Sequence, residues 1–149
     1  MSGSWLGRWL GISGAFAAFL GIAHLGSAPE VMRRFPPDIP DDGRRIFFFM
    51  FLAAGASVVL AGALLIWSAV GTARRWRGFW SLGLVSGLYL AVLGGTAAAL
   101  MPSNPFAYLV LASGLSALPP LFLLRRAWRG QGDLLDFRRD APKEKRTFH

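Results

Sequence analysis

The stretch that decides the fold is residues 78–124, GFWSLGLVSGLYLAVLGGTAAALMPSNPFAYLVLASGLSALPPLFLL, which contains no Asp, Glu, Lys or Arg over 47 positions. As a single helix it would be about 70 Å long, whereas the hydrocarbon core of a bilayer is about 30 Å thick. The stretch carries its own interruption at residues 101–105 (MPSNP), where two prolines flank Ser and Asn. Because proline breaks a helix interior, this segment predicts a tight turn between two membrane-spanning helices.

Working outward, two further charge-free runs cover residues 9–29 and 46–73. Each is long enough for one transmembrane helix. We therefore predict an all-α, polytopic membrane protein with the lipid bilayer as its environment. It is a compact four-transmembrane-helix bundle with spans at about 9–25, 46–70, 79–100 and 106–124. Residues 1–124 form the transmembrane domain. Residues 125–149 form a basic tail, with a short surface helix at 133–139 and a disordered end at 141–149.

The basic residues indicate how the chain is oriented. Arg8, three arginines in residues 71–78 and eight Lys or Arg against four acids in residues 125–149 all fall on one predicted side. Residues 26–45, on the other side, balance four arginines with four acids. Because cytoplasmic loops carry the excess of Lys and Arg, both termini are predicted to be cytoplasmic and the 26–45 loop external. The net charge of +8 thus indicates topology and attraction to anionic lipid, and no nucleic acid partner is predicted.

A second interpretation of the N-terminus stays open at this point. Arg8, the apolar stretch behind it and Gly26-Ser27-Ala28 resemble a cleavable signal peptide. The length of the apolar stretch, and Pro29 directly after Ala28, favour a first helix that is retained. The other three helices keep the same orientation in either case.

Small residues recur four positions apart in the predicted spans: Gly7/Gly11, Gly14/Ala18, Gly83/Gly87, Gly87/Ala91 and Ser113/Ala117. Gly55 and Gly62 mark one face of the second span. Apolar helices gain no hydrophobic energy from one another in lipid, so close packing at small residues holds such bundles together. These pairs predict internal packing. An intermolecular surface, for a homo-oligomer or for other membrane-protein subunits, is the alternative.

Aromatic residues gather at the predicted boundaries. All six tryptophans fall near the cytoplasmic side: Trp5, Trp9, Trp67, Trp76, Trp80 and Trp128. Phenylalanines and a tyrosine mark the external side: Phe47, Phe48, Phe49, Phe51, Phe106 and Tyr108. This placement predicts aromatic belts at the two membrane interfaces. The alternative is a flat aromatic surface for a pigment, a quinone or a neighbouring subunit.

The residues missing from the chain exclude several functions. Without cysteine, no disulfide, thiolate metal site, iron–sulfur cluster or thiol redox relay can form within it. No Asp, Glu, Lys or Arg lies in a predicted span, although such residues mark proton relays and ion paths. The two histidines, His24 and His149, are too few for the two axial pairs of a di-haem cytochrome. We predict no catalytic residue and no metal site, and the balance favours a protein that is not an enzyme.

His24 is the one titratable residue associated with a predicted span, near its external end. It could ligate the metal of a chlorophyll or haem, or donate a hydrogen bond to a quinone carbonyl. It could equally bond a nearby backbone carbonyl. A binding site for a lipophilic molecule predicts that His24 and the polar residues Asn104 or Tyr108 lie around one apolar pocket. The other candidate contacts for a ligand or partner lie in the external loop: Glu30, Arg33 and Arg34.

One resemblance to a known family rests on the first span. Its residues Arg8, Gly11, Gly14, Phe19, Gly21 and His24, with the four-span layout, resemble the opening of DoxX-like small four-helix bacterial membrane proteins. That family includes a subunit associated with quinol-linked oxidation. The resemblance therefore implies a respiratory or accessory role in the bacterial inner membrane. The long Pro- and Asp-containing external loop departs from the family, and no catalytic residue is transferred.

Two functional hypotheses follow. The first is a non-catalytic accessory, stabilising or assembly subunit of a larger membrane complex. It is motivated by the lack of buried charge, the small-residue helix faces and the aromatic boundaries. The second is a binder or redox processor of a lipophilic small molecule, such as a quinone or pigment, at the external interface. The sequence identifies no cofactor.

The predicted orientation can be tested by cysteine labelling. The chain has no cysteine, so Asp41→Cys introduces a single thiol in the predicted external loop. We expect it to react with a membrane-impermeant maleimide in intact cells, and a reporter fused after residue 149 to be cytoplasmic, because the Lys and Arg excess sets orientation. Labelling of residue 41 only after lysis would reverse the arrangement.

Overall fold

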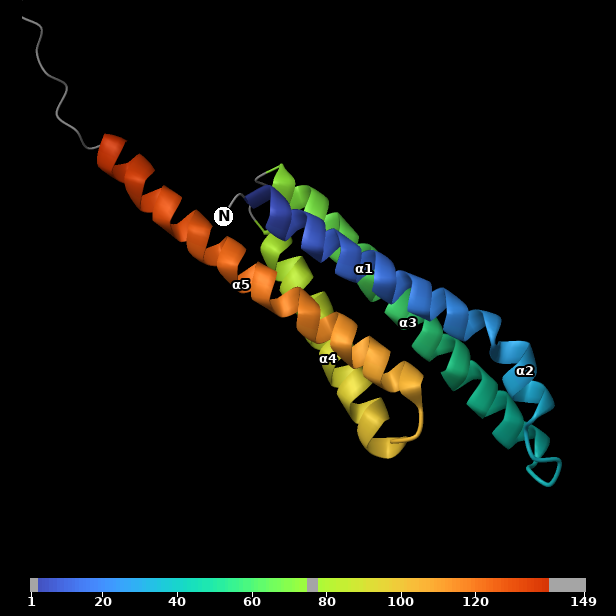
Figure 1. Cartoon of the computed structure of the whole chain (residues 1–149). Coiled ribbons are helices and arrows are strands. Elements are labelled where there is room, and N and C mark those ends of the chain that lie inside the picture. Colours follow the sequence, from blue (N-terminus) through green and yellow to red (C-terminus); the bar gives the residue numbers. More distant parts are fainter. Residues whose placement is uncertain (1–2, 75–77, 140–149) are drawn as a thin grey trace, which may run out of the picture.

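The computed structural model describes residues 3–74 and 78–139, and every regular element within these ranges is an α-helix. The elements are α1 (Gly3–Gly26), α2 (Ala28–Arg33), α3 (Asp41–Ala73), α4 (Phe79–Leu100) and α5 (Pro105–Arg139). Of these, α1, α3, α4 and α5 are long and apolar enough to cross a membrane. The predicted all-α bundle of four transmembrane helices is confirmed (Figure 1).

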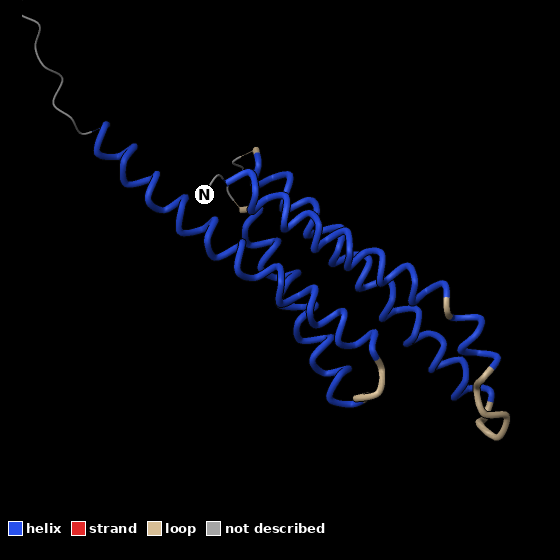
Figure 2. Tube along the Cα trace, in the orientation of Figure 1, coloured by secondary structure: helices blue, strands red, loops and turns tan. Residues whose placement is uncertain are grey.

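The four long helices alternate in direction along the chain (Figure 2). Helix α1 packs against α3, and α4 packs against α5. The two pairs meet where α1 contacts α5 and α3 contacts α4. The core between them takes one fully buried leucine from each helix: Leu10, Leu65, Leu90 and Leu121. The predicted turn at residues 101–105 places α4 beside α5, and the predicted bounds of the third span match α4 at both ends.

Small residues let the helices of each pair approach closely. A Cβ atom added to Gly62 on α3 would lie 2.5 Å from the backbone nitrogen of Ala18 and 2.6 Å from the carbonyl oxygen of Gly14, both on α1. On α5, a Cβ added to Gly114 would overlap the backbone of Ala91 on α4. These glycines therefore serve packing within the chain, as the spacing predicts.

Two prolines inside α5 determine how α1 packs on it. Pro120 has no N–H, so the carbonyl of Ser116 lacks its usual intrahelical donor. The indole of Trp9 donates a hydrogen bond to this carbonyl at 3.1 Å, and the hydroxyl groups of Ser13 and Ser116 are 3.1 Å apart. Because a bilayer core offers no water, a side chain from the neighbouring helix has to replace the missing donor.

The tryptophans thus do more than line the membrane boundary. Trp80 on α4 also donates its indole N–H to a carbonyl of α5, that of Leu121, at 2.8 Å. The guanidinium of Arg125 lies 4.5 Å from the centre of the Trp80 ring. Trp5 and Trp67 are more than half exposed, as an interfacial belt requires. The side chains of Trp76 and Trp128 lie outside the described part of the chain.

The helices differ in length. Helix α3 has 33 residues and α4 has 22. These lengths correspond to about 50 Å and 33 Å of helix. Figure 1 shows α2 and the first part of α3 extending beyond the turn between α4 and α5. At the opposite end, α5 continues past its apolar part to Arg139. The short separate helix expected at residues 133–139 is therefore the end of α5. Residues 75–77 and 140–149 lie outside the described residues.

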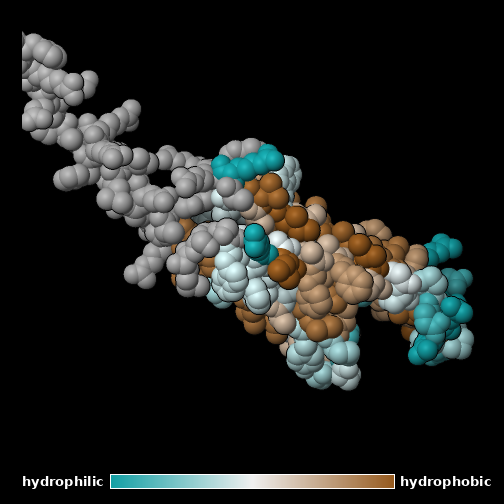
Figure 3. Space-filling view, turned by 45° about the horizontal axis from the view of Figure 1, so that its top comes forward, coloured by the Kyte–Doolittle hydropathy of each residue, from teal (hydrophilic) through white to brown (hydrophobic). Residues whose placement is uncertain are grey.

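The exterior of the bundle is apolar around its middle. In Figure 3, hydrophobic residues cover the centre of the visible face and hydrophilic residues lie toward its ends. Large apolar side chains that are more than 60% exposed occur on α1, α3 and α4, for example Phe19, Phe49 and Val85. Such a surface matches lipid and would be unfavourable in water.

Adjacent glycines on α4 provide a test of this packing. A Cβ at Gly94 would overlap the backbone of Leu111, whereas one at Gly95 would meet only the Cδ1 atom of Leu111, at 3.8 Å. We expect Gly94→Ala to lower the free energy of unfolding in detergent by about 1–3 kcal/mol through overpacking. Gly95→Ala should leave it unchanged or raise it by up to about 1 kcal/mol, because alanine favours the helix. Equal effects of the two variants would contradict this packing.

Candidate functional site

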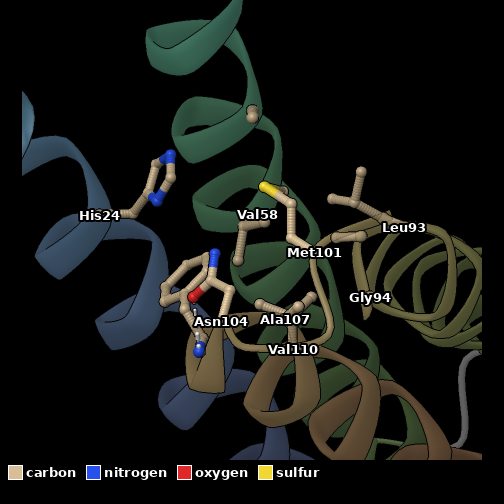
Figure 4. Close-up of a pocket in the computed structure, with 11 residues that line it drawn as sticks. His24, Val58, Leu93, Gly94, Met101, Asn104, Ala107 and Val110 are labelled. Atoms are coloured by element: carbon tan, nitrogen blue, oxygen red, sulfur yellow. Dashed lines mark hydrogen bonds between the residues drawn. The ribbon is translucent and has the colours of Figure 1, made fainter. Parts of the chain in front are cut away.

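A cavity of about 100 Å³ lies where the four long helices meet the turn between α4 and α5. Its lining is almost entirely apolar and includes Val58, Leu93, Met101, Ala107 and Val110. Two polar side chains reach it, His24 from α1 and Asn104 from the turn. Figure 4 shows His24 projecting from α1 toward α3, on the same side of the pocket as Asn104.

The position of His24 depends on a glycine of α3. Gly55 has no side chain, and a Cβ at this position would lie 3.0 Å from the Cδ2 atom of His24. The imidazole can therefore lie against α3, where it stacks on Phe51 with the ring centres 3.8 Å apart and the planes at 19°. Phe106 stacks on it too, at 4.7 Å and 26°. Because phenyl rings hold the imidazole, only its edge is available for polar contacts.

One nitrogen at that edge has no partner. The backbone of Phe51 forms a hydrogen bond with the imidazole. One ring nitrogen of His24 is therefore bonded to a nearby carbonyl, as one of the two interpretations of His24 predicts. Nε2, however, is buried and has no hydrogen-bond partner among the described residues. A buried polar atom without a partner is unfavourable by about 1–3 kcal/mol, so a bound group that hydrogen bonds to it would be stabilised.

Asn104 owes its place in the pocket to its role at the start of α5. Its Oδ1 atom accepts a hydrogen bond from the backbone N–H of Phe106 at 3.1 Å, and Pro105 is the first residue of the helix. Asn before Pro is the usual arrangement at a helix N-terminus. Since Oδ1 is engaged, the side-chain nitrogen of Asn104 remains as a donor (Figure 4), although the wall of the cavity itself is formed almost entirely by apolar atoms.

The other sequence-predicted contacts do not reach the pocket. The hydroxyl of Tyr108 donates to the carbonyl of Pro102 at 3.2 Å. On α2, Glu30 pairs with Arg33 at 3.1 Å and with Arg34 at 2.7 Å, and these side chains are about half to four-fifths exposed. None of these residues lines the cavity. The structure therefore brings together His24 and Asn104 and leaves the rest outside.

Sequence reasoning missed how the site is held. Phe51 and Phe106 were predicted as boundary aromatics, yet both stack on the imidazole. Gly55 was recognised as part of a small-residue face but not as the position against which His24 packs. The pocket-facing side of α4, which includes Ala97, carries no polar residue that could have signalled it.

The fold and site together define the class of protein. Four apolar spanning helices with a lipid-compatible exterior make the chain a multi-pass integral membrane protein. Within the described residues, no three His, Asp or Glu side chains gather as a metal site. Comparison with protein-family models, curated proteins and solved structures finds no match. The function therefore has to be argued from the pocket itself.

Substitutions at His24 test whether its Nε2 atom is buried without a hydrogen-bond partner. His24→Phe keeps an aromatic ring for Phe51 and Phe106 and removes the buried nitrogen. We expect it to raise the free energy of unfolding by about 1 kcal/mol, because relief of an unpartnered buried polar atom outweighs the loss of one hydrogen bond. His24→Ala should lower stability instead, since stacking is lost. Unfolding by SDS in mixed micelles measures both, and a His24→Phe variant as unstable as His24→Ala would contradict the assignment.

Proposed function

We propose that this protein binds a lipophilic small molecule whose polar atom hydrogen bonds to His24. The observation that carries the proposal is the buried Nε2 atom of His24, which has no partner and belongs to a side chain lining an apolar cavity. Apolar pockets with a few well-placed polar groups are typical small-molecule sites. Because the other ring nitrogen donates to the carbonyl of Phe51, Nε2 of the neutral imidazole is an acceptor. Asn104 supplies a donor, so the head group of the ligand should carry a hydroxyl group for His24 and an acceptor oxygen for Asn104.

The volume narrows the class of ligand. An apolar cavity of about 150 Å³ accommodates benzene, and the cavity here, about 100 Å³, is smaller but partly open. A single ring can therefore enter in part, with an apolar tail outside the pocket. A tetrapyrrole pigment is far larger. A quinone in its reduced form, a quinol, has one ring, two hydroxyl groups that both donate and accept hydrogen bonds, and an apolar tail, so it is preferred to a chlorophyll or haem.

The location and cellular context are part of the same proposal. From the excess of Lys and Arg we infer that both termini are cytoplasmic and that the His24 pocket lies toward the external side. The resemblance of the first helix to DoxX-like proteins supports the bacterial inner membrane and a link to quinol oxidation. A quinol dissolved in the membrane would reach this pocket without leaving the bilayer.

Binding of a decyl-substituted benzoquinol, kept reduced, to the detergent-solubilised protein tests the proposal. We expect His24→Phe to weaken binding about tenfold, the effect of one lost hydrogen bond in a buried site. Ala97→Phe should weaken it as strongly by filling the cavity, since Ala97 lines the pocket. Titration calorimetry provides the affinities.

Two controls accompany these variants. Ala99 lies on the same helix but is exposed and does not line the pocket, so Ala99→Phe should bind the quinol like the unmodified protein. Tyr108→Phe removes a hydroxyl near the same turn but outside the cavity. The proposal fails if the unmodified protein does not bind the quinol, or if Ala99→Phe weakens binding as much as Ala97→Phe.

A second candidate function is that of a non-catalytic accessory, stabilising or assembly subunit of a larger membrane complex, such as a respiratory complex. The observation in its favour is the part of α3 that extends beyond the α4–α5 turn. Ile46, Phe49 and Met50 on it are each more than 60% exposed, a surface on which another membrane subunit could pack. The two functions are compatible. Gentle extraction and native mass measurement separate them: a subunit is recovered with its partner, whereas a lone monomer that retains a quinol indicates binding alone.

A further inference from the structure

A second apolar recess lies at the opposite end of the bundle from His24. It is a groove of about 340 Å³ between the first turns of α1 and the proline-containing part of α5. Its walls are formed by Trp5, Leu6 and Trp9 on one side and by Pro119, Pro120 and Leu123 on the other. We call this the α1/α5 groove. It shares no residue with the His24 pocket.

A hydrogen bond and an aromatic stack hold the walls of the groove in place. Trp9 is held by its hydrogen bond to Ser116, whose carbonyl Pro120 leaves without an intrahelical donor. Trp5 stacks on Trp9 with ring centres 5.8 Å apart and planes at 26°. The consecutive prolines present only their compact rings on the α5 side. The groove is therefore a shaped apolar surface that can receive a flexible apolar chain.

The two stacked indoles differ in what their N–H groups do. That of Trp9 is engaged by Ser116, whereas that of Trp5 has no hydrogen-bond partner among the described residues, and Trp5 is 52% exposed. Trp5 is near the start of α1, where an indole at a membrane boundary donates to lipid head groups. One free donor thus stands at the mouth of an apolar groove.

A positive charge lies near this donor along α1. Arg8 is three residues after Trp5, is exposed, does not itself line the groove, and has no ion-pair partner among the side chains that the structure describes. This end of the bundle also carries Arg74 and Arg125, whereas Glu30 and Asp41 lie at the other end; Asp133 and Asp136 belong to the part of α5 whose side chains are not described. The groove is therefore an apolar trough with an N–H donor at its mouth and an exposed cation nearby on α1.

We propose that the α1/α5 groove binds a phospholipid with an anionic head group. One acyl chain lies along Pro119 and Pro120, and the phosphate contacts Arg8 and the indole N–H of Trp5. Basic sites between transmembrane helices favour anionic lipids, because each Lys or Arg near the membrane surface strengthens binding about fivefold. The bound lipid would cover the weak point of α5, where consecutive prolines interrupt its hydrogen bonding.

Native mass spectrometry of the delipidated full chain with phosphatidylglycerol or phosphatidylcholine of the same acyl chains tests the proposal. We expect tighter binding of phosphatidylglycerol. Arg8→Gln should weaken it about fivefold, and Trp5→Phe, which keeps the ring but removes the N–H, should weaken it severalfold. The double variant should bind both lipids alike. Leu123→Trp, which fills the groove, should weaken binding of both lipids.

Matched controls lie outside the groove. Arg45→Gln removes an exposed arginine at the other end of the bundle, Trp67→Phe removes an exposed indole N–H, and Leu115→Trp enlarges an exposed leucine of α5. All three should bind phosphatidylglycerol normally. Equal binding of the two lipids by the unmodified protein overturns the proposal, as does an Arg45→Gln effect as large as that of Arg8→Gln. Neither outcome bears on quinol binding at His24.

Discussion

Close contact between helix backbones at glycine is the interaction on which the rest of this structure depends. Lipid offers no hydrophobic drive to bring one apolar helix against another, so dispersion contacts and a few hydrogen bonds have to do so. Gly62 against Ala18 and Gly114 against Ala91 set the spacing within each helix pair. Once α1 is that close to α3, the side chain of His24 has room only over Gly55, where Phe51 and Phe106 hold it. The geometry of the candidate site is thus a consequence of packing farther along the same helices.

The polar groups of the bundle fall into two kinds. Most form hydrogen bonds that hold the helices together. Ser68 donates to the carbonyl of Phe79, Trp80 donates to that of Leu121, and Trp9 replaces the donor that Pro120 lacks. A few buried side-chain atoms have no partner in the described residues, among them Ser86 Oγ and His24 Nε2. Of these, Nε2 of His24 belongs to a ring that stacks on two phenyl rings and lines a cavity also lined by a hydrogen-bond donor, Asn104. That combination distinguishes a prepared binding group from a local packing defect.

Much of the architecture could be predicted from the distribution of charge and proline. Pro102, Asn104 and Pro105 define the turn because they combine a helix break with a helix N-cap, and the bounds of α4 follow from it. The pairing of His24 with Asn104 could be anticipated because both are polar residues at the same end of their helices. What could not be predicted is which face each helix turns inward. Helices that are apolar all round have no polar face to define their rotation, so the inward direction of Trp9 and Trp80, and the outward one of Tyr108, become visible only with the neighbouring helices in place.

The unequal helix lengths have a consequence for the membrane around the protein. The charge-free part of α3, residues 46–73, has 28 residues, whereas the apolar part of α5 in residues 105–124 has 20. These correspond to about 42 Å and 30 Å of helix, against a hydrocarbon core of about 30 Å. A flat bilayer cannot match both sides of the same molecule at once. The bundle therefore has to tilt, or the lipid must thicken beside α3, and the energy of either response depends on acyl-chain length. Lipids of different acyl-chain length therefore exert a different torque on the bundle and change its tilt.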